Sequence, residues 1–566
     1  MLPLRDRTAA IAAFALRGLG VGLFLICAWL SFRRHLHIDE LSGLYAIQLG
    51  AAFGHAEYGT IELSSVLFRP LARWLASSQR LFVGFRILEL GLLFGLCWSI
   101  ARVQSALPSA LGRAFVFFLA VTFGPLWRHG FEVRHDIFVA YEVVLLAWAG
   151  ERARLGRLDR WASSATGLGV ILVQANSLKA FTLWVPGIAL CALLATRSQG
   201  SKLKRFTATS LSFLPGMLLG CALIALVFGA TGMLGEYWLQ LRQFTSFSST
   251  PPYRLSALPL LDFALARAPI HFAFVLCGLL SAAFRVLTRK PLAGALVPLG
   301  AFALSALSIC ANPTPFPYNL TWLTPAWLLM AAYGAGQALE MMKKHATRSI
   351  LFGAALGTCS GCLFLFWFCE QDPYYRKNWD SQLRVVASAE ALTSPTDSVL
   401  DLCGLVISRP PVAKDWIVHS LYMPDYHAGR RETVRRIIER VWPPVAINVY
   451  RWSFLDRADL LSFRRNYVRF SDNVWTLGQT LRPNDTRFEI HRAGHYRVSA
   501  QSDAGTLDGH ALHDADVLFL ERGAHALGTT TSLTIAWNGP GIPALPPHAD
   551  GPLFLSGELP KQRAGR

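Results

Sequence analysis

The sequence predicts an α-helical protein that crosses a membrane many times and ends in a soluble region of α/β and β structure. Up to about residue 370, apolar stretches of about 17–25 residues recur, which is the length that spans the hydrocarbon core of a bilayer. Beyond that point such stretches stop, and short segments of alternating polarity replace them. The hydrophobic content of 53% and the charged content of 16% are therefore averages over two unlike parts.

The apolar part is expected to contain about eleven spans. They cover residues 10–32, 82–101, 112–128, 134–150, 162–176, 179–196, 208–231, 269–287, 291–310, 319–338 and 349–369. The first span follows a basic start with Arg5 and Arg7 and lacks a convincing small-residue cleavage site after it. We therefore expect it to remain as a membrane anchor.

The charges of the loops predict the orientation in the membrane. The formal net charge is +18, and much of the excess lies in short loops between spans, for example 151–160, 197–205 and 343–348. If the N-terminus is cytoplasmic, each of these loops is cytoplasmic, as the positive-inside rule requires. An odd number of spans then places the region after residue 370 outside the cytoplasm. The chain shows no basic–aromatic module of the usual kinds, so no nucleic acid is expected as a partner.

The soluble region is expected to contain two parts. Residues 371–480 form an α/β domain, with helices at 380–393 and 430–441 and strands at 398–402, 445–450 and 467–477. From about residue 481 to 566 the pattern is β alone, with strands near 488–491, 495–499, 517–520 and 532–537 separated by Gly and Asp. This end suggests a small β-sandwich and a possible carbohydrate-binding module. Residues 1–370 form the transmembrane module.

Cysteines and metal-ligand patterns exclude other classes. Nine of the ten cysteines lie in the apolar part, and Cys403 alone lies beyond it, so the soluble region cannot form an internal disulfide. No zinc-type spacing is present. His35, His37 and Asp39 occupy alternate positions. On a helix this spacing does not bring the three side chains together around a metal ion. Neither a metal nor a cofactor is expected.

Ionisable residues gather where spans meet water on one side of the membrane. Asp39 and Glu40 follow the first span, and Arg134 and Asp136 begin the fourth. With Arg69, Lys179 and Tyr318, these residues all map to the outer ends of spans or to outer loops. Such charges are costly near hydrocarbon unless they bind or react with something. Three further residues of outer loops are candidate substrate-binding residues, namely His55, Glu62 and Arg242.

This group of residues suits one reaction type. A carboxylate can accept a proton from an acceptor hydroxyl, and nearby cations can stabilise a departing phosphate as its negative charge grows. Because nucleotide sugars are not available on the outer face, the donor would be a sugar on a lipid phosphate. Asp39, Glu40 and Asp136 are the candidate catalytic carboxylates, and Arg69, Arg134, Lys179 and Tyr318 are the candidate donor-phosphate ligands.

Each of these residues also has a structural interpretation. Asp39 can cap a surface helix, and Arg134 with Asp136 can form an ion pair that only stabilises the bundle. Lys179 and Arg69 can extend to lipid headgroups, and Tyr318 can belong to an aromatic belt. The Asp514-Ala515-Asp516 sequence, which resembles a motif of nucleotide-sugar enzymes, fits a turn better because it lies in the β-rich end.

The arrangement resembles the GT-C superfamily of integral membrane glycosyltransferases, especially the bacterial aminoarabinose transferases that act on lipid A and the protein O-mannosyltransferases. Asp39-Glu40 matches the acidic pair of their first outer loop, and Arg134-His135-Asp136 resembles a motif that opens a later span. Phe68-Arg69-Pro70-Leu71 and Pro317-Tyr318 resemble two further segments of these families. The Glu-Lys pair of the first loop of the aminoarabinose enzymes is not evident, and Glu62-Leu63 is the nearest match.

The resemblance implies an inverting glycosyltransferase of the bacterial inner membrane with its C-terminal region in the periplasm. Asp39 would be the catalytic base, and Tyr318 would lie near the donor phosphate. The partners would be membrane lipids, a polyprenyl-phosphate sugar donor and a carbohydrate, lipid or protein acceptor such as lipopolysaccharide. The alternative is a transporter or flippase of lipid-linked glycans, which would place its polar groups near the bilayer midplane.

Overall fold

The computed structural model describes most of the chain, in two compact units. The described residues are 4–34, 36–49, 62–75, 77–103, 107, 109–132, 134–177, 180–196, 201–247, 258–292, 294–311, 317–341, 346–413, 423–483, 485–500, 505–529, 531–540 and 553. Unit 1 comprises residues 1–32, 61–67 and 85–373, and unit 2 comprises residues 33–60, 68–84 and 374–566. Two of the five boundaries between the units fall within continuous helices, α5 (Ser78–Val103) and α18 (Ala346–Ala391).

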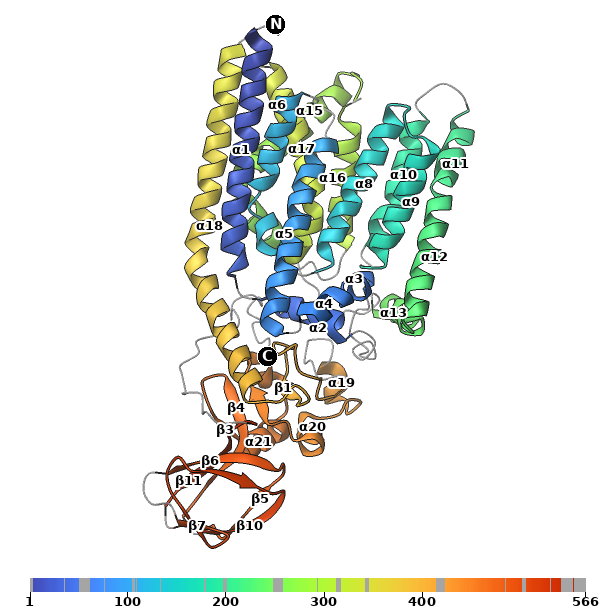
Figure 1. Ribbon diagram of the computed structural model, residues 1–566. Coiled ribbons are helices and arrows are strands. Elements are labelled where there is room, and N and C mark those ends of the chain that lie inside the picture. The colour runs from blue at the N-terminus through green and yellow to red at the C-terminus, as the bar shows by residue number, and fades with distance from the viewer. Residues whose placement is uncertain are drawn as a thin grey trace, which may run out of the picture. The chain divides into compact units, whose positions relative to one another are not determined.

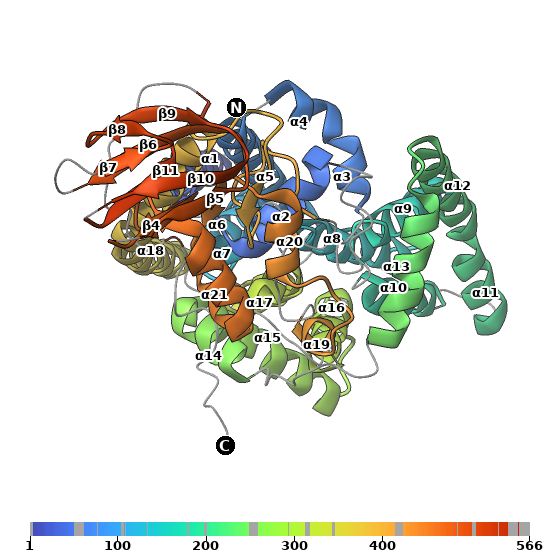
Figure 2. The same ribbon diagram turned by 90° about the horizontal axis from the view of Figure 1, so that it is seen from below.

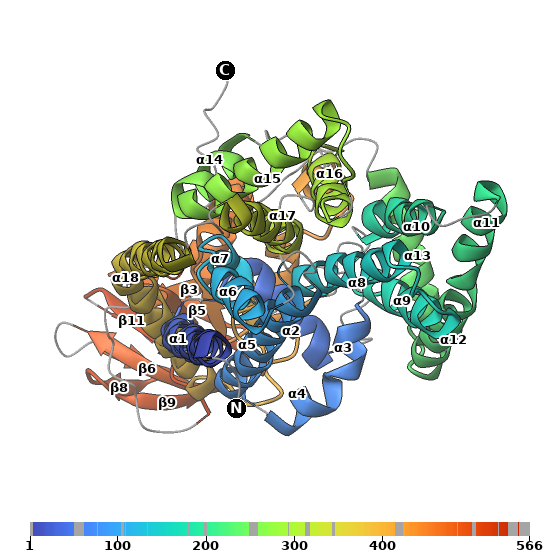
Figure 3. The same cartoon turned by 90° about the horizontal axis from the view of Figure 1, so that it is seen from above.

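Unit 1 is built from helices (Figures 1 and 3). Besides its parts of α5 and α18 it contains α1 (Leu4–Phe32), α3 (Leu63–Leu67), α6 (Ala110–Val121), α7 (Leu126–His129), α8 (Asp136–Arg154), α9 (Arg160–Gln174), α10 (Phe181–Ala195), α11 (Lys202–Ser212), α12 (Leu214–Ala230), α13 (Leu234–Phe247), α14 (Leu258–Arg267), α15 (Pro269–Leu287), α16 (Leu296–Ala311), the 3₁₀ turn η3 (Pro317–Asn319) and α17 (Leu320–Met341).

Four helical stretches among the described residues are long and apolar enough to cross a membrane. They are Ala9–Phe32, Ser78–Val103, Lys202–Ala230 and Pro269–Leu287. Shorter apolar helices cover Ala110–Val121, Phe181–Ala195, Leu296–Cys310 and Gly357–Cys369. Each predicted span overlaps at least one of the helices given above. The number of spans that cross the membrane stays a prediction.

Glycines let the helices of unit 1 approach closely. A Cβ atom on Gly334 of α17 would lie 1.9 Å from the Phe274 carbonyl oxygen of α15, and one on Gly216 of α12 would lie 1.7 Å from the Ser164 carbonyl oxygen of α9. These contacts are too short for any other residue. The α15–α17 and α9–α12 pairs thus pack backbone against backbone, as helices in membranes often do.

Two predicted helical elements differ from the structure. The predicted span 112–128 is interrupted, because α6 ends at Val121 and the chain turns through Gly124-Pro125 before α7 begins. Proline lacks an amide hydrogen and disfavours a helical conformation in the residue before it. The separate helix predicted at 380–393 is instead the end of α18, which runs for 46 residues without a break.

Unit 2 combines two surface helices of the first loop with the C-terminal region. The helices are α2 (Ile38–Leu49), α4 (Arg69–Leu75), α19 (Met423–His427), α20 (Val434–Val441), α21 (Arg457–Asn466) and the 3₁₀ turn η5 (Tyr450–Phe454). The strands are β1 (Val399–Asp401), β2 (Val445–Ile447), β3 (Tyr467–Arg469), β4 (Val474–Leu481), β5 (Arg487–Ile490), β6 (Gly494–Ala500), β7 (Gly505–Leu507), β8 (His510–Leu512), β9 (Val517–Leu520), β10 (Gly523–Gly528) and β11 (Leu533–Trp537).

The strands form a seven-stranded and a four-stranded sheet. The larger has the order β1-β2-β4-β11-β6-β9, with β3 also paired to β4, and the smaller has the order β5-β10-β7-β8. β1 and β2 are parallel, with Val399 opposite Val445, whereas β2, β3 and β11 all run antiparallel to β4. Figure 2 shows β4, β11 and β6 side by side. The boundary predicted between residues 480 and 481 falls inside β4.

Besides the helix 380–393, one further predicted C-terminal element needs a correction. The helix 430–441 contains α20, and the strands 398–402 and 445–450 contain β1 and β2. The single strand predicted at 467–477 is two strands, because the chain reverses at Ser471 and Val468 pairs with Thr476. The fold class, a polytopic helical protein with a C-terminal α/β region and a β-rich end, is confirmed.

The close approach of α15 and α17 generates a prediction about stability. Replacing Gly334 with Ala should lower the thermal midpoint of the detergent-solubilised protein, because overpacking costs about 1–3 kcal/mol. Gly91 of α5 is the control, since a Cβ atom there meets nothing within 4 Å. Gly91→Ala should keep or raise the midpoint. Equal midpoints for Gly334→Ala and the native protein would contradict this packing.

Candidate functional site

A cluster of buried charges lies between α6 and α8 in unit 1. The chain turns at Gly124-Pro125, and the Trp127 indole N–H donates to the Val121 carbonyl oxygen at 2.7 Å, which fixes that turn. The nine residues that follow contain a run of ionisable side chains, namely Arg128, His129, Glu132, Arg134, His135 and Asp136. Asp136 is the first residue of α8, where the helix dipole favours a negative charge.

Arg134 is held between two carboxylates. Its Nε atom lies 3.1 Å from Asp136 Oδ2, and its Nη1 atom lies 4.0 Å from Glu132 Oε2. The other Glu132 oxygen, Oε1, lies 2.9 Å from His129 Nδ1. These four residues are only 2% to 9% exposed. Since buried charges are tolerated only when they are paired, this chain of contacts fixes the geometry of the loop.

The 3₁₀ turn η3 supplies an aromatic ring to the same cluster. The Arg134 guanidinium carbon lies 3.7 Å from the centre of the Tyr318 ring, and the His129 ring meets Tyr318 edge-on at 6.3 Å. A guanidinium over an aromatic face gains a cation–π attraction that grows as water is excluded. Tyr318 therefore limits the directions in which Arg134 can point.

The first outer loop reaches the cluster through α3. His135 Nδ1 lies 2.9 Å from Glu62 Oε1, and the Ser64 hydroxyl donates to Glu62 Oε2 at 3.3 Å. The α3 helix is itself fixed, because the Ser64 N–H donates to Asn176 Oδ1 at 2.7 Å. Glu62 is thus tied to the start of α8 although 73 residues separate it from His135.

Buried polar atoms near the cluster lack a hydrogen-bond partner among the described residues. Among them are His135 Nε2 and both polar side-chain atoms of Asn319. Asn319 follows Tyr318 in the chain and is 0% exposed. An unsatisfied buried polar group is costly, so a bound polar group would stabilise this region. A phosphate oxygen or a sugar hydroxyl has the required chemistry.

The predicted site residues divide between the two units. Arg134, Asp136 and Tyr318 are in direct contact, and Glu62 joins them through His135. Asp39 lies on α2, and Arg69 is the first residue of α4, so both belong to unit 2. Arg242 lies exposed on α13, with its guanidinium carbon 5.8 Å from the Trp238 ring. His55 and Lys179 lie outside the described residues.

Glu40 has a structural task in unit 2. It is fully buried, and its Oε2 atom accepts the backbone N–H of His37 at 3.1 Å, just before α2 begins. This contact is half of a capping box, in which the third residue of a helix bonds back to the cap residue. Glu40 therefore helps to cap the start of α2.

Sequence reasoning missed His129, Glu132 and Asn319. The available signal was the density of charge at 128–136, which contrasts with the apolar stretches on both sides. His129 and Glu132 fall at the end of the predicted span 112–128 and in the gap after it, where only Arg134 and Asp136 were considered. Among the described residues no group of three or more His, Cys, Asp or Glu side chains could hold a metal ion.

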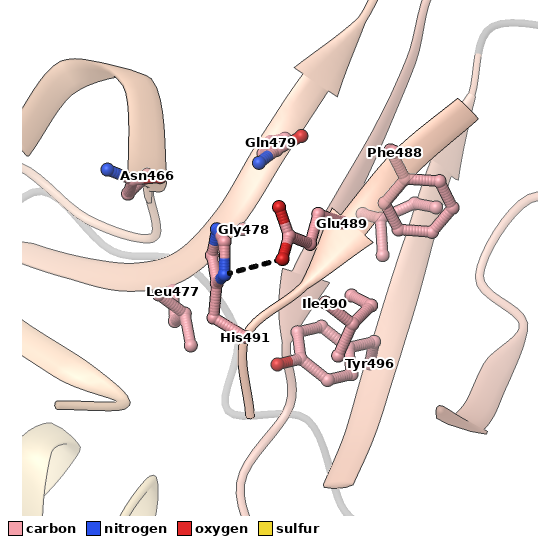
Figure 4. A pocket seen from close by; sticks show the side chains of 10 residues that line it. Asn466, Leu477, Gly478, Gln479, Phe488, Glu489, Ile490, His491 and Tyr496 are labelled. Carbon is pink, nitrogen blue, oxygen red and sulfur yellow. Dashed lines mark ion pairs between the residues drawn. The ribbon is translucent and has the colours of Figure 1, made fainter. Parts of the chain in front are cut away.

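The β-rich end holds a separate pocket with room for about one water molecule (Figure 4). Leu477 and Gly478 of β4 and residues 488–491 contribute to its lining. His491 Nδ1 lies 3.7 Å from Glu489 Oε1, and the His491 ring stacks on Trp442 at 3.6 Å. The pocket offers carboxylate, amide and imidazole groups beside apolar side chains. A carbohydrate-binding role for this end stays a prediction.

Comparisons with known proteins identify the fold. No protein-family model and no curated protein matches the chain. Among solved structures, ArnT from Cupriavidus metallidurans in the apo state aligns with a TM-score of 0.52 at 13% identity, over 82% of this chain and 98% of that one. The oligosaccharyltransferase AglB from Archaeoglobus fulgidus, in complex with an inhibitory peptide and a dolichol-phosphate, aligns with a TM-score of 0.47 at 10% identity, over 89% of this chain and 76% of that one.

At this identity the likeness to ArnT concerns the fold alone. It agrees with the apolar helices of unit 1 and with the resemblance that the loop motifs carried. The chain is a multi-pass membrane protein with the fold of the GT-C membrane glycosyltransferases.

Proposed function

We propose that this protein is an inverting glycosyltransferase that moves a sugar from a polyprenyl phosphate to an acceptor hydroxyl. The observation that carries the proposal is the Arg134–Asp136–Tyr318 cluster, beside which buried polar atoms of His135 and Asn319 make no hydrogen bond among the described residues. A site of this kind suits a phosphate, because a guanidinium forms charge-assisted hydrogen bonds with phosphate oxygens. The GT-C fold supports the same class of reaction.

The roles of the residues follow from the chemistry of the transfer. The Asp39 carboxylate accepts the proton of the acceptor hydroxyl, whose oxygen attacks the anomeric carbon of the donor sugar. The bond from that carbon to the phosphate oxygen breaks, and the polyprenyl phosphate leaves with the bonding electron pair. Arg134 stabilises the charge that develops on the phosphate. His135, which is bonded to Glu62 through Nδ1, offers its Nε2 atom to the departing phosphate.

In this scheme the two carboxylates beside Arg134 orient its guanidinium group. Asp136 and Glu132 hold the guanidinium in place. Arginine presents its N–H donors in a rigid plane, which suits the oxygens of a phosphate. Asp136 is accordingly assigned to positioning Arg134, and the base is assigned to Asp39.

The first prediction concerns the base. Asp39→Asn keeps the size of the side chain but cannot accept a proton, so the transfer rate should fall roughly 100- to 10,000-fold. Binding of the lipid donor and the thermal midpoint should not change. The measurement is single-turnover transfer with a purified polyprenyl-phosphate sugar. Transfer at close to the native rate would remove Asp39 from this role.

The second prediction concerns the donor phosphate. Arg134→Lys keeps the charge that Asp136 needs but loses the planar fork, so KM for the lipid donor should rise by about 10- to 100-fold, the worth of a charge-assisted hydrogen bond. Arg285→Lys is the matched control, since Arg285 bonds to Gln337 and to the Pro291 carbonyl at the end of α15. Its KM should stay within about twofold of the native value.

Two outcomes would contradict this part of the proposal. One is an unchanged donor KM in a correctly folded Arg134→Lys variant. The other is full activity with a nucleotide sugar when no polyprenyl lipid is present. The second outcome would place the donor in a different chemical class, whatever the effect of Arg134.

The third prediction concerns topology. We place the C-terminal region outside the cytoplasm, in the periplasm of a bacterial inner membrane, because the predicted inner loops are basic. A reporter enzyme that folds only outside the cytoplasm should be active when fused after Trp475 and silent when placed in loop 197–205. The reverse pattern would put Asp39 on the cytoplasmic side and remove the reason to prefer a lipid-linked donor.

A further inference from the structure

The helix that carries Asp39 belongs to unit 2 and is too short to be stable alone. α2 has 12 residues, and helices of this length are marginal in water without tertiary contacts. Its buried side chains, Leu41, Leu44, Tyr45 and Ile47, are 0% to 3% exposed. At helical spacing, position 39 lies on another side of the helix from residues 41, 44 and 45. The position of Asp39 therefore depends on what holds the buried face of α2.

The start of α2 is fixed by a buried amide from the end of α18. The Leu36 N–H donates to Gln382 Oε1 at 2.7 Å, and Gln382 Nε2 donates to the Leu36 carbonyl oxygen at 3.0 Å. The same Nε2 atom also donates to the Leu553 carbonyl oxygen at 3.0 Å. Leu36 and Gln382 are both 0% exposed. Gln382 thus holds both backbone groups of the residue that lies three positions before Asp39.

The middle of α2 is fixed by Tyr45. Its hydroxyl group lies 3.0 Å from two carbonyl oxygens that can accept its proton, those of Val406 and Arg409. Burial, with the nearby Asp401 and Cys403, raises the pKa of Tyr45 well above its ordinary value, so the hydroxyl remains a donor. Phenylalanine would fill the same space and leave both carbonyl oxygens without this donor.

The loop that receives Tyr45 is itself rigid. Asp401 accepts the backbone N–H groups of Cys403, Gly404 and Val406 at 2.8 to 3.2 Å. Arg409 donates from Nε to the Thr393 hydroxyl at 2.8 Å and from Nη2 to the Glu390 carbonyl at 2.7 Å. These hydrogen bonds fix the loop that carries the Val406 and Arg409 carbonyl oxygens. The contact of the Tyr45 hydroxyl with these oxygens therefore defines a fixed position for α2.

We propose that Tyr45 and Gln382 are positioning residues that hold α2, and with it Asp39, in the arrangement that transfer requires. The inference rests on the proposed role of Asp39 as the base. Neither residue acts on the substrate itself; each acts through the place of the carboxylate. A displacement of about 1 Å in a catalytic group can lower a rate by about 100-fold. Expressed as free energy, this loss is larger than the loss of folding stability that one missing hydrogen bond causes.

The experiment compares two tyrosines of unit 2 in the full-length protein. Tyr45→Phe should lower kcat by roughly 10- to 100-fold and leave KM for the lipid donor within about twofold of the native value. Tyr467→Phe is the matched control, because Tyr467 is 1% exposed and its hydroxyl donates to the Pro443 carbonyl at 2.8 Å, away from α2. It should lose comparable stability and keep its kcat. Equal kcat values for the two variants would overturn the proposal.

A double variant separates positioning from any other effect. If Tyr45 acts through Asp39, then Asp39→Asn with Tyr45→Phe should be no slower than Asp39→Asn alone. A further loss of 10-fold or more would overturn the proposal. Should Tyr45→Phe not fold, Gln382→Met, which keeps the volume and removes the amide, gives the same comparison.

The outcomes also distinguish this inference from the proposed function. Near-native transfer by Asp39→Asn would overturn the assignment of the base, and with it the positioning role. If the single variant Asp39→Asn is inactive while the single variant Tyr45→Phe is folded and fully active, only the positioning role would be overturned.

Discussion

The pairing of buried charge around Arg134 is the constraint on which the rest of unit 1 depends. A lone guanidinium at this depth would cost several kcal/mol, and removing one partner of a buried pair typically costs about 3–5 kcal/mol. Asp136, Glu132 and Tyr318 must therefore stay where they are, since each contacts Arg134. That requirement fixes the start of α8 and the turn η3.

The fold was largely predictable, because long apolar stretches and alternating segments are strong signals. The elements whose prediction was wrong differ from the structure for local physical reasons. The strand predicted at 467–477 is divided because Ser471 forms a tight turn, in which the Ser471 hydroxyl accepts the Val474 N–H at 3.1 Å and Phe470 bonds back to Val474. Ser471, Asp472 and Asn473 do favour a turn, but the apolar residues on both sides of them give the stronger strand pattern. The 46-residue α18 was divided in the prediction because its polar second half lacks the apolar pattern of a span.

The site was partly predictable, for a different reason. Arg134 and Asp136 stood out because charge is rare in apolar surroundings, and Tyr318 followed from the family resemblance. Their contact with Glu62 could not be read from the chain, since it depends on α3 returning to α8 across 73 residues. The same holds for Leu36 and Gln382, which are 346 residues apart. The contact of Glu40 with the His37 backbone caps the start of α2 and depends on where that helix begins.

The pairing of β4 has a consequence for any attempt to shorten this protein. Its first half pairs with β2 and β3 of the α/β part, and its second half, from Gly478 to Leu481, pairs with β11 of the β-rich end. Deleting the β-rich end would expose the backbone groups of that second half along an open strand edge, together with the apolar face beneath it. Open edges of this kind recruit strands from other molecules. A shortened chain would therefore be prone to aggregate, and loss of activity in it would say nothing about sugar recognition.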